Sequence, residues 1–215
     1  AAKRAAELCQ QMLAYAGKGK FLVAPLNITE LTQEMTSLLR LTIAKEATLH
    51  CELSSEVPAI NADPIQIRQI IMNLVINASE ALGNKPGEII LHTGAGHFDK
   101  KYLSECYFDD NLEEGVYTFL EVTDSGSGMD EDTLRKLFDP FFSTKFTGRG
   151  LGLAATLGII RSHHGAIRVT STAGKGSTFR VLLPAEGTRS PAHAVQASAA
   201  KSSCWRGSGT ILIVD

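Results

Sequence analysis

Apolar residues recur at intervals of three and four in four stretches of the chain, which is the pattern of amphipathic helices. The predicted helices span residues 1–17, 30–44, 64–82 and 151–163. Thr29 is the expected N-cap of the second helix, and Asp63 followed by Pro64 marks the start of the third. Glycines within residues 83–87 are expected to end the third helix.

Segments with the composition of β-strands lie between and after these helices. They are residues 48–53, 88–93, 116–123, 166–171 and 177–183. The polar segment 97–115 is expected to be a hairpin with an irregular tip, and the last two strands are expected to form a second hairpin around Gly174. This order predicts an α+β fold, a two-layer sandwich in which helices cover one face of a mixed sheet.

The globular pattern ends before the chain does. After Pro184 the composition shifts to Ala, Ser, Gly and Thr, so residues 185–209 are expected to be a linker that cannot build a core. Residues 210–215, TILIVD, have the pattern of a buried parallel strand that ends in a carboxylate. Because the chain begins at Ala1 in helical sequence, we expect it to be a piece of a longer protein.

Composition narrows the classes of function. Of the 215 residues 44% are hydrophobic, but the apolar runs are far shorter than the roughly 20 residues of a membrane helix. The formal net charge of -2 argues against broad electrostatic capture of nucleic acid or of an anionic membrane. The cysteines form neither a disulfide scaffold nor a zinc motif, since they stand far apart at Cys9, Cys51, Cys106 and Cys204. We therefore expect a cytoplasmic segment without a nucleic-acid or membrane partner.

Two asparagines on the third predicted helix are the first candidates for chemistry. Asn73 and Asn77 are four residues apart and so share a face of an otherwise apolar helix. One interpretation is that they bond the backbone of a neighbouring loop, because buried polar groups need partners. The other is that an amide oxygen binds Mg²⁺, which takes oxygen ligands and leaves most of its shell to water and phosphates.

The sequence DSGSGM at residues 124–129 follows directly after a predicted strand, so Asp124 is expected at the end of that strand. One interpretation is a structural turn, since these are turn-forming residues. In the functional interpretation, Asp124 accepts a hydrogen bond from the exocyclic amine of adenine, and the glycines let the base approach the backbone. Guanine would present a carbonyl there and be repelled.

The third candidate is FDPFFSTK at residues 138–145, followed by GRGLGL at residues 148–153. A glycine-rich turn before a helix N-terminus presents backbone N–H groups and the positive end of the helix dipole, which suit phosphate. Lys145 and Arg149 add positive charge. A flexible loop without function has the same local pattern. The P-loop, the dinucleotide-binding fingerprint and the eukaryotic protein-kinase motifs are absent from the sequence.

Taken in order, these motifs resemble the catalytic, ATP-binding domain of sensor histidine kinases, in the gyrase and heat-shock-chaperone ATPase superfamily. Five motifs of that family, the N box, the first glycine box, the F box and the second and third glycine boxes, are similar to residues 73–78, 124–129, 138–145, 148–153 and 174–179. The resemblance covers residues 22–184. It implies a mixed five-stranded sheet backed by three helices, with ATP bound between helices under a mobile lid.

The resemblance also implies which residues carry the activity. Asn73, Asn77 and Lys145 would be catalytic, and Asn77 would bind Mg²⁺. The residues implied in binding ATP are Asn77, Ala81, Asp124, Gly126, Gly128, Met129, Lys145, Gly150, Leu151, Gly152 and Ser177. The implied reaction is transfer of the γ-phosphoryl group of Mg-ATP to a histidine on an adjacent domain in two-component signalling, the reaction of a protein-histidine kinase.

The flanking segments extend the resemblance beyond the catalytic domain at residues 21–184. Residues 1–20 look like the end of a dimerisation and histidine-phosphotransfer helix, and residues 210–215 look like the first strand of a receiver domain. The implied protein is a hybrid kinase that forms a homodimer at full length. Its partners would be the histidine-containing domain upstream and a response-regulator receiver domain.

The sequence departs from the family pattern at three points. None of the six histidines has the acidic neighbour on a helix that marks a phospho-acceptor, so the acceptor is expected outside this chain. Asn73 stands where ATPase relatives have a Glu that activates water, and an amide cannot take the proton. Glu80 stands where the family often has a basic residue. Phosphotransfer is therefore the leading function, and the alternatives are a gyrase-like ATPase and a nucleotide-binding regulatory module without phosphotransfer.

Overall fold

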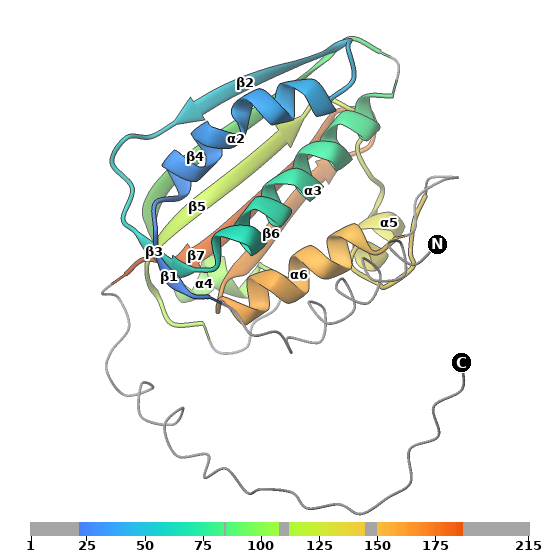
Figure 1. Ribbon diagram of the computed structural model, residues 1–215. Helices are drawn as coiled ribbons and strands as arrows, with labels where there is room; N and C mark the ends of the chain where they lie inside the picture. Colours follow the sequence, from blue (N-terminus) through green and yellow to red (C-terminus); the bar gives the residue numbers. More distant parts are fainter. Residues whose placement is uncertain (1–21, 84, 108–111, 145–149, 187–215) are drawn as a thin grey trace, which may run out of the picture.

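The computed structural model describes residues 22–83, 85–107, 112–144 and 150–186. These residues form two layers, a five-stranded sheet and a layer of helices that covers one of its faces (Figure 1). The α+β two-layer architecture that the sequence predicts is confirmed. The sequence around this domain, residues 1–21 and 187–215, lies outside the described residues.

The sheet contains all five predicted strands, in mixed orientation. Their spatial order is β2 (Ala47–Leu53), β4 (Gly87–Phe98), β5 (Gly115–Asp124), β7 (Gly176–Pro184) and β6 (Ala166–Thr172). Strands β2 and β4 are parallel, and the connection between them contains helix α3 (Pro64–Leu82). The other three neighbouring pairs are antiparallel.

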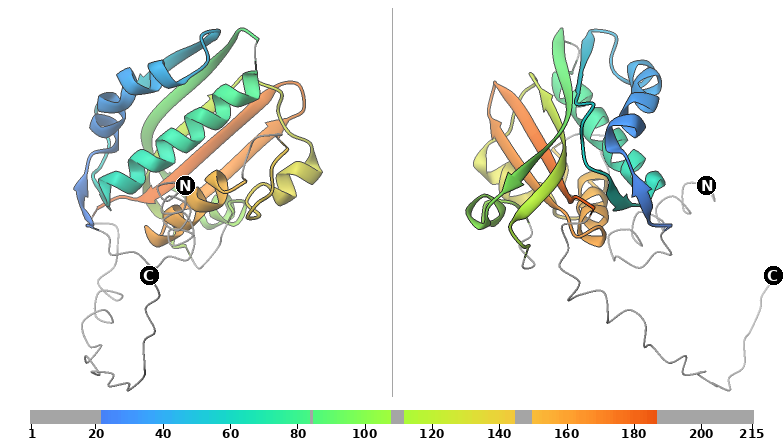
Figure 2. Two further views of the ribbon diagram at one scale, coloured as in Figure 1. Left: turned by 45° about the vertical axis from the view of Figure 1, so that its right-hand side comes forward. Right: turned by 90° about the vertical axis from the view of Figure 1, so that its left-hand side faces the viewer.

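Three helices, α2 (Ile28–Thr42), α3 and α6 (Gly152–Ser162), lie side by side on one face of the sheet (Figures 1 and 2). Helix α3 is central and contacts both of the others. Its apolar stripe packs on the sheet, so that Ile71, Leu91 and Leu120 belong to one continuous core. No helix in the described part of the chain has the length and apolar character needed to span a membrane.

The helix boundaries test the predicted caps. The start of α3 is confirmed, because Asp63 is its N-cap and Pro64 lies in its first turn. The cap predicted for α2 is wrong. Asn27 is the N-cap, since its side-chain oxygen accepts hydrogen bonds from the backbone N–H groups of Thr29 and Glu30. Thr29 therefore lies inside the first turn.

Some short elements were not predicted. Strands β1 (Ala24–Leu26) and β3 (Ile60–Ala62) form a separate antiparallel pair, and α5 (Glu131–Lys136) follows β5. Elements of three to six residues are too short to show a hydrophobic period, which explains why the pattern missed them. The linker boundary was also placed too early. Ala185 is buried, and its N–H donates to Val116 O at 3.2 Å.

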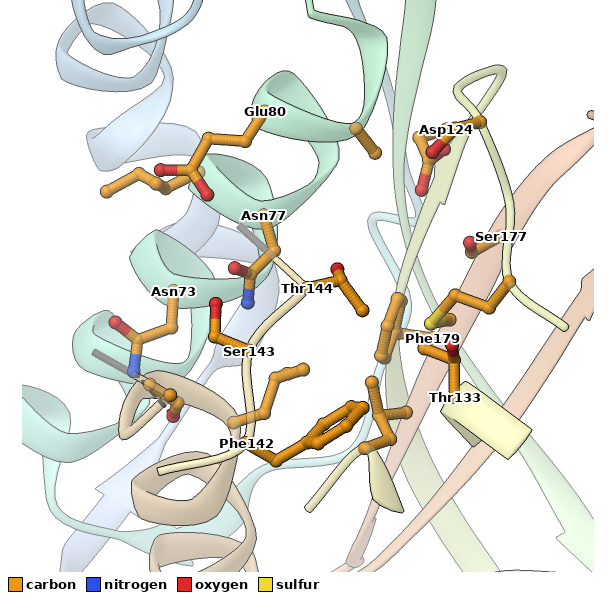
Figure 3. A pocket seen from close by; sticks show the side chains of 18 of the residues that line it. Asn73, Asn77, Glu80, Asp124, Thr133, Phe142, Ser143, Thr144, Ser177 and Phe179 are labelled. Carbon is orange, nitrogen blue, oxygen red and sulfur yellow. Dashed lines mark hydrogen bonds between the residues drawn. The ribbon is translucent and has the colours of Figure 1, made fainter. Parts of the chain in front are cut away.

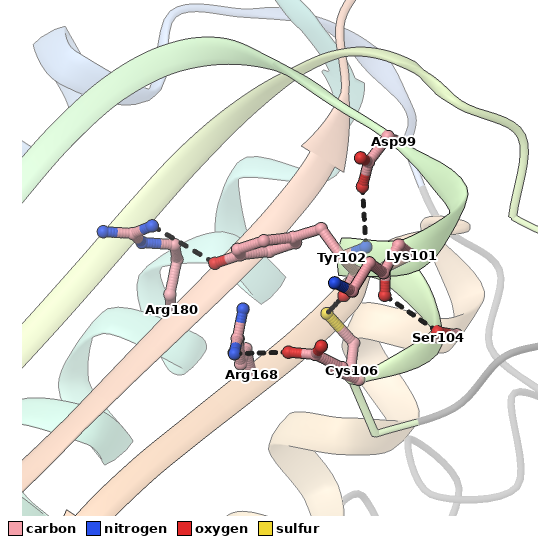
Figure 4. Close-up of polar contacts among 8 residues, drawn as sticks. Asp99, Lys101, Tyr102, Ser104, Cys106, Arg168 and Arg180 are labelled. Carbon is pink, nitrogen blue, oxygen red and sulfur yellow. Dashed lines mark hydrogen bonds and ion pairs between the residues drawn. The ribbon is translucent and has the colours of Figure 1, made fainter.

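The opposite face of the sheet carries α4 (Lys100–Ser104) where a hairpin tip was predicted. A second apolar cluster forms beneath it from Phe98, Leu103, Cys106, Tyr117, Ala166 and Leu182. Arg180 donates to the Tyr102 hydroxyl at 3.1 Å, and the Arg168 guanidinium lies 4.5 Å from the centre of the Tyr102 ring (Figure 4). The polar composition of this segment thus reflects a helix that is held to β6 and β7 by arginines.

Candidate active site

A cavity of about 540 Å³ opens between α3, α5, α6 and the adjoining ends of β5 and β7 (Figure 3). It brings together most of the predicted site residues, namely Asn73, Asn77, Ala81, Asp124, Gly128, Met129, Gly150, Leu151, Gly152 and Ser177. Gly126 does not line it. Lys145 lies outside the described residues.

The two asparagines of α3 have different environments, although they are one turn apart. Asn73 Nδ2 donates to Gly152 O and to Thr156 Oγ1, each at 3.2 Å, so this amide holds α3 against the first turn of α6. The side-chain amide of Asn77 makes no hydrogen bond to any residue that the structure describes, and it lines the cavity (Figure 3). Asn73 therefore fits the interpretation of a bond to neighbouring backbone, and Asn77 is the amide available to a ligand.

Asp124 is the last residue of β5 and is only 4% exposed. Its Oδ1 accepts a hydrogen bond from Gly126 N at 2.8 Å. Ser177 on β7 is paired directly with Asp124 and is 6% exposed. Because a buried carboxylate is costly unless donors surround it, this corner of the cavity suits a ligand that donates hydrogen bonds.

The glycines of the loop after β5 allow close backbone packing. A Cβ on Gly126 would lie 2.7 Å from the carbonyl carbon and oxygen of Ala81, and Ser127 N donates to the same Ala81 O at 3.0 Å. Gly128 has a φ of +61°, and a Cβ there would overlap the carbonyl of Thr172. The loop thus lies directly on the end of α3 and on β6. This packing role differs from the predicted one, in which the glycines make room for a base.

The N-terminus of α6 faces the cavity without a capping side chain. Leu151 occupies the N-cap position and makes no side-chain hydrogen bond, whereas a side chain of Asn or Asp caps each of α2, α3, α4 and α5. Gly150, with a φ of +64°, leads into the helix. The N–H groups of an uncapped first turn and the helix dipole both favour a bound anion.

The aromatic residues of the predicted lid fall into three environments. Phe138 is buried in the core, and Phe142 lines the cavity. Phe141 is 65% exposed and has a φ of +69°. The alternative of a flexible loop without function therefore does not fit Phe138 and Phe142. Lys145 and Arg149 lie outside the described residues, so the lid stays a prediction.

The other residues of the cavity wall were not predicted as site residues. Some of them lie within the motifs, and Glu80 was noted as a departure from the family pattern. They are Ile76, Glu80, Ser127, Thr133, Leu137, Phe142, Ser143, Thr144, Leu153 and Phe179. Thr133 lies on α5, whose start the sequence does signal. Asp130 caps α5 by accepting a hydrogen bond from Thr133 N at 2.8 Å, and hydrogen bonds from Thr133 hold the pKa of Asp130 below its usual value.

His163 ends α6 and has a structural role. Asp63 N donates to His163 Nε2 at 3.1 Å, so the ring proton is on Nδ1, which donates to Ile159 O at 2.8 Å. Both ring nitrogens are used to hold the end of α6 against the start of α3. Among the described residues, no group of three or more His, Cys, Asp or Glu side chains could hold a metal ion.

Comparisons with known proteins agree with this geometry. Residues 62–187 match the family model described as histidine kinase-, DNA gyrase B-, and HSP90-like ATPase. Sensor kinase CckA of Brucella abortus (strain 2308) is 32% identical over 221 residues, which is 100% of this chain and 23% of that protein. Sensor histidine kinase ZraS of Escherichia coli (strain K12) is 36% identical over 146 residues, 68% of this chain and 27% of that protein.

Solved structures show the same likeness. The nucleotide-free catalytic domain of the histidine kinase ThkA is similar with a TM-score of 0.58 and 28% identity, covering 76% of this chain and 95% of that one. The chain spans about a quarter of the length of the curated relatives named above.

Proposed function

Because the chain belongs to the family of histidine kinase-, DNA gyrase B- and HSP90-like ATPases, we propose that its cavity binds Mg-ATP and presents the γ-phosphoryl group to a histidine on an adjacent domain. One observation carries the proposal. A buried carboxylate, Asp124, an amide without a partner among the described residues, Asn77, and the uncapped N-terminus of α6 converge on one cavity. They suit the base, the metal and the phosphates of Mg-ATP, respectively.

Asp124 would recognise the base. An ionised carboxylate is an acceptor only, so it would accept a hydrogen bond from the exocyclic amine of adenine. The apolar side chains of Met129, Leu137 and Phe179 line the same cavity and would pack on the ring. A volume of about 540 Å³ lies within the range of small-molecule sites, about 300–1,000 Å³.

Asn77 would hold the metal, and its environment fits that role. One neutral amide oxygen is enough for a site in which phosphate oxygens and water supply the other ligands of Mg²⁺. When bound, Mg²⁺ would neutralise charge on the β- and γ-phosphates. Asn73 would act as a positioning residue, because its amide already ties α3 to α6 through Gly152 and Thr156.

The start of α6 would bind the phosphates. Gly150, Leu151 and Gly152 line the cavity, and the first-turn N–H groups of the helix would bond the phosphate oxygens. Lys145, from the segment before them, would add positive charge. We also propose that residues 141–149 close over the nucleotide, since Phe141 is exposed and lids are drawn from weakly held loops.

The reaction would form a bond between a ring nitrogen of the acceptor histidine and the γ-phosphorus. The bond from that phosphorus to the β–γ bridging oxygen breaks, and ADP leaves. The attacking nitrogen uses its lone pair, so the proton to be lost is on the other ring nitrogen; it must go to a base, and the Asn73 amide cannot accept it. This chain would therefore contribute positioning and charge stabilisation, and the base would come from the acceptor domain.

The proposal extends to the rest of the protein. Residues 1–20 would be the end of a dimerisation helix from the histidine-containing domain, residues 187–209 a linker, and residues 210–215 the start of a receiver domain. The full-length protein would be a homodimeric hybrid kinase. A cytoplasmic location is part of the proposal, because ATP is supplied there.

The test combines this chain, γ-labelled ATP and the histidine-containing domain of the same protein as a separate fragment. We expect label on the fragment and none on this chain, and we expect Asn77→Ala to abolish the transfer. Thr170→Ala, on the exposed face of β6, is the matched control and should transfer normally. Release of free phosphate without labelled fragment would favour a gyrase-like ATPase. Binding of ATP with neither reaction would favour a regulatory module.

A further inference from the structure

Ser171 on β6 lies behind the corner of the cavity that holds Asp124, and it does not line the cavity itself. Its hydroxyl has three neighbours. It accepts a hydrogen bond from Met129 N at 2.8 Å, and it lies 3.0 Å from Gly176 O and 3.0 Å from Ser177 Oγ. Met129 and Ser177 are both wall residues. One side chain outside the cavity is therefore bonded to two groups in its wall.

The proton count at Ser171 allows two arrangements, because a serine hydroxyl has one proton and two lone pairs. In the first, Ser171 donates to Gly176 O, and Ser177 donates to Ser171. Every contact then has one proton between its two heavy atoms. In the second, Ser171 donates to Ser177, and the oxygens of Ser171 and Gly176 face each other at 3.0 Å with no proton between them. Since a carbonyl cannot donate, the first arrangement is favoured.

We propose that Ser171 makes Ser177 a hydrogen-bond acceptor towards the cavity and thereby selects purine nucleotides with an amine at position 6. With its proton held by Ser171, Ser177 offers only lone pairs to a ligand. Asp124, which is paired with Ser177 across β5 and β7, is also an acceptor. An amine with two protons satisfies both oxygens, directly or through water, and a carbonyl oxygen in the same place satisfies neither.

This inference rests on the proposed binding of ATP and adds a positioning residue that does not touch the ligand. Ser171 also supports the glycine-rich loop through Met129 N, and the loop is further held by Gly174 N, which donates to Ser127 O at 2.6 Å. Loss of loop support alone would weaken all nucleotides by a similar factor. The ratio of affinities for two bases is therefore the readout that separates the two roles.

The test compares Ser171→Thr with Ser171→Val, which have nearly the same shape and differ in the hydroxyl. Calorimetry on the whole chain with Mg²⁺ gives the Kd for ATP and for ITP, which has a carbonyl at position 6. We expect the wild type and Ser171→Thr to prefer ATP. In Ser171→Val the Ser177 proton is free to donate to a carbonyl, so the preference should fall roughly five- to tenfold. Thr170→Ala, the neighbour on the other face of β6, should leave the ratio unchanged.

Each of the other possible results of this experiment decides for or against the inference. Equal weakening of ATP and ITP in Ser171→Val, or a wild type that binds both equally, overturns the inference and leaves the proposed function standing. A wild type that binds neither nucleotide overturns both. If Ser171→Val loses its thermal unfolding transition, Ser177→Ala gives the answer, because it removes the acceptor and should lower the preference for ATP to a similar extent. An unchanged ratio in that variant refutes the inference.

Discussion

Replacing Asp124 by Asn tests the proposed recognition of the base with the least change of shape. The amide keeps an oxygen that can accept from Gly126 N, which now lies 2.8 Å from Asp124 Oδ1. The turn after β5 should therefore form as before. The substitution makes two changes. The second carboxylate oxygen is replaced by an NH₂ donor, and the negative charge is lost.

The size of the effect follows from the burial of this group. A hydrogen bond to a charged acceptor contributes about 1.5–3 kcal/mol, and a buried donor that faces another donor costs about 1–3 kcal/mol more. Asp124 is 4% exposed, so water does not relieve that cost. The sum, about 2.5–6 kcal/mol, corresponds to roughly 10²- to 10⁴-fold weaker binding of ATP. The empty protein should be as stable as the wild type or more stable, because no carboxylate is buried.

Calorimetry measures the predicted loss of ATP affinity, and thermal unfolding measures the stability of the protein with and without ATP. With ATP at 100 times its Kd, the wild type should gain about 2.7 kcal/mol. That gain is a shift in Tm of roughly 5–10 °C for a domain of this size. Asp124→Asn should gain at most about 0.4 kcal/mol at the same concentration, a shift of no more than about 2 °C. Asp99→Asn makes the same charge change at the cap of α4, on the other face of the sheet, and should behave as the wild type. A folded Asp124→Asn variant with an ATP affinity within about threefold of wild type would refute the reasoning.

Three further predictions concern the metal, the glycine-rich loop and a buried thiol. Asn77→Ala should weaken nucleotide binding more with Mg²⁺ than in EDTA, since one metal ligand is lost; equal losses in calorimetry would indicate packing instead. Gly126→Ala should lower the free energy of unfolding by about 1–3 kcal/mol in urea titrations, because a Cβ there meets backbone atoms at 2.7 Å. Gly83→Ala, which meets nothing within 4 Å, should also cost about 1–3 kcal/mol, but through backbone strain alone, because its φ of +63° and ψ of -129° suit only glycine. Burial raises the pKa of the Cys106 thiol from 9.0 to about 11, so its contribution to stability should be complete below pH 9.0 and be lost as the pH rises towards 11. Iodoacetamide at pH 8 should modify Cys51 well before Cys106 when each peptide is followed by mass spectrometry; equal rates would contradict the buried environment.

The elements with long periodic patterns and strong local signals could be read from the sequence alone. The 19-residue helix α3 is visible as an apolar stripe, and its start is visible in Asp63 and Pro64, because an N-cap and a proline act within one turn. The order of the five motifs was sufficient to indicate which residues would share a site. Most of them do line one cavity.

How residues that are distant in the sequence meet could not be predicted without the folded chain. Asn73 and Asn77 are equivalent in the sequence pattern, and they differ because Thr156, 83 residues beyond Asn73, lies beside only one of them. At the end of α6 the left-handed residue is His164, with a φ of +55°, and Gly165 is needed because a Cβ there would overlap Leu182 O on β7.

The role inferred for Ser171 likewise depends on the meeting of the glycine-rich loop with the β6–β7 turn. The physical reason is common to these cases. Caps, turns and periodicity act over a few residues, whereas the direction of a hydrogen bond depends on which surfaces pack together, and that is decided by the whole core at once.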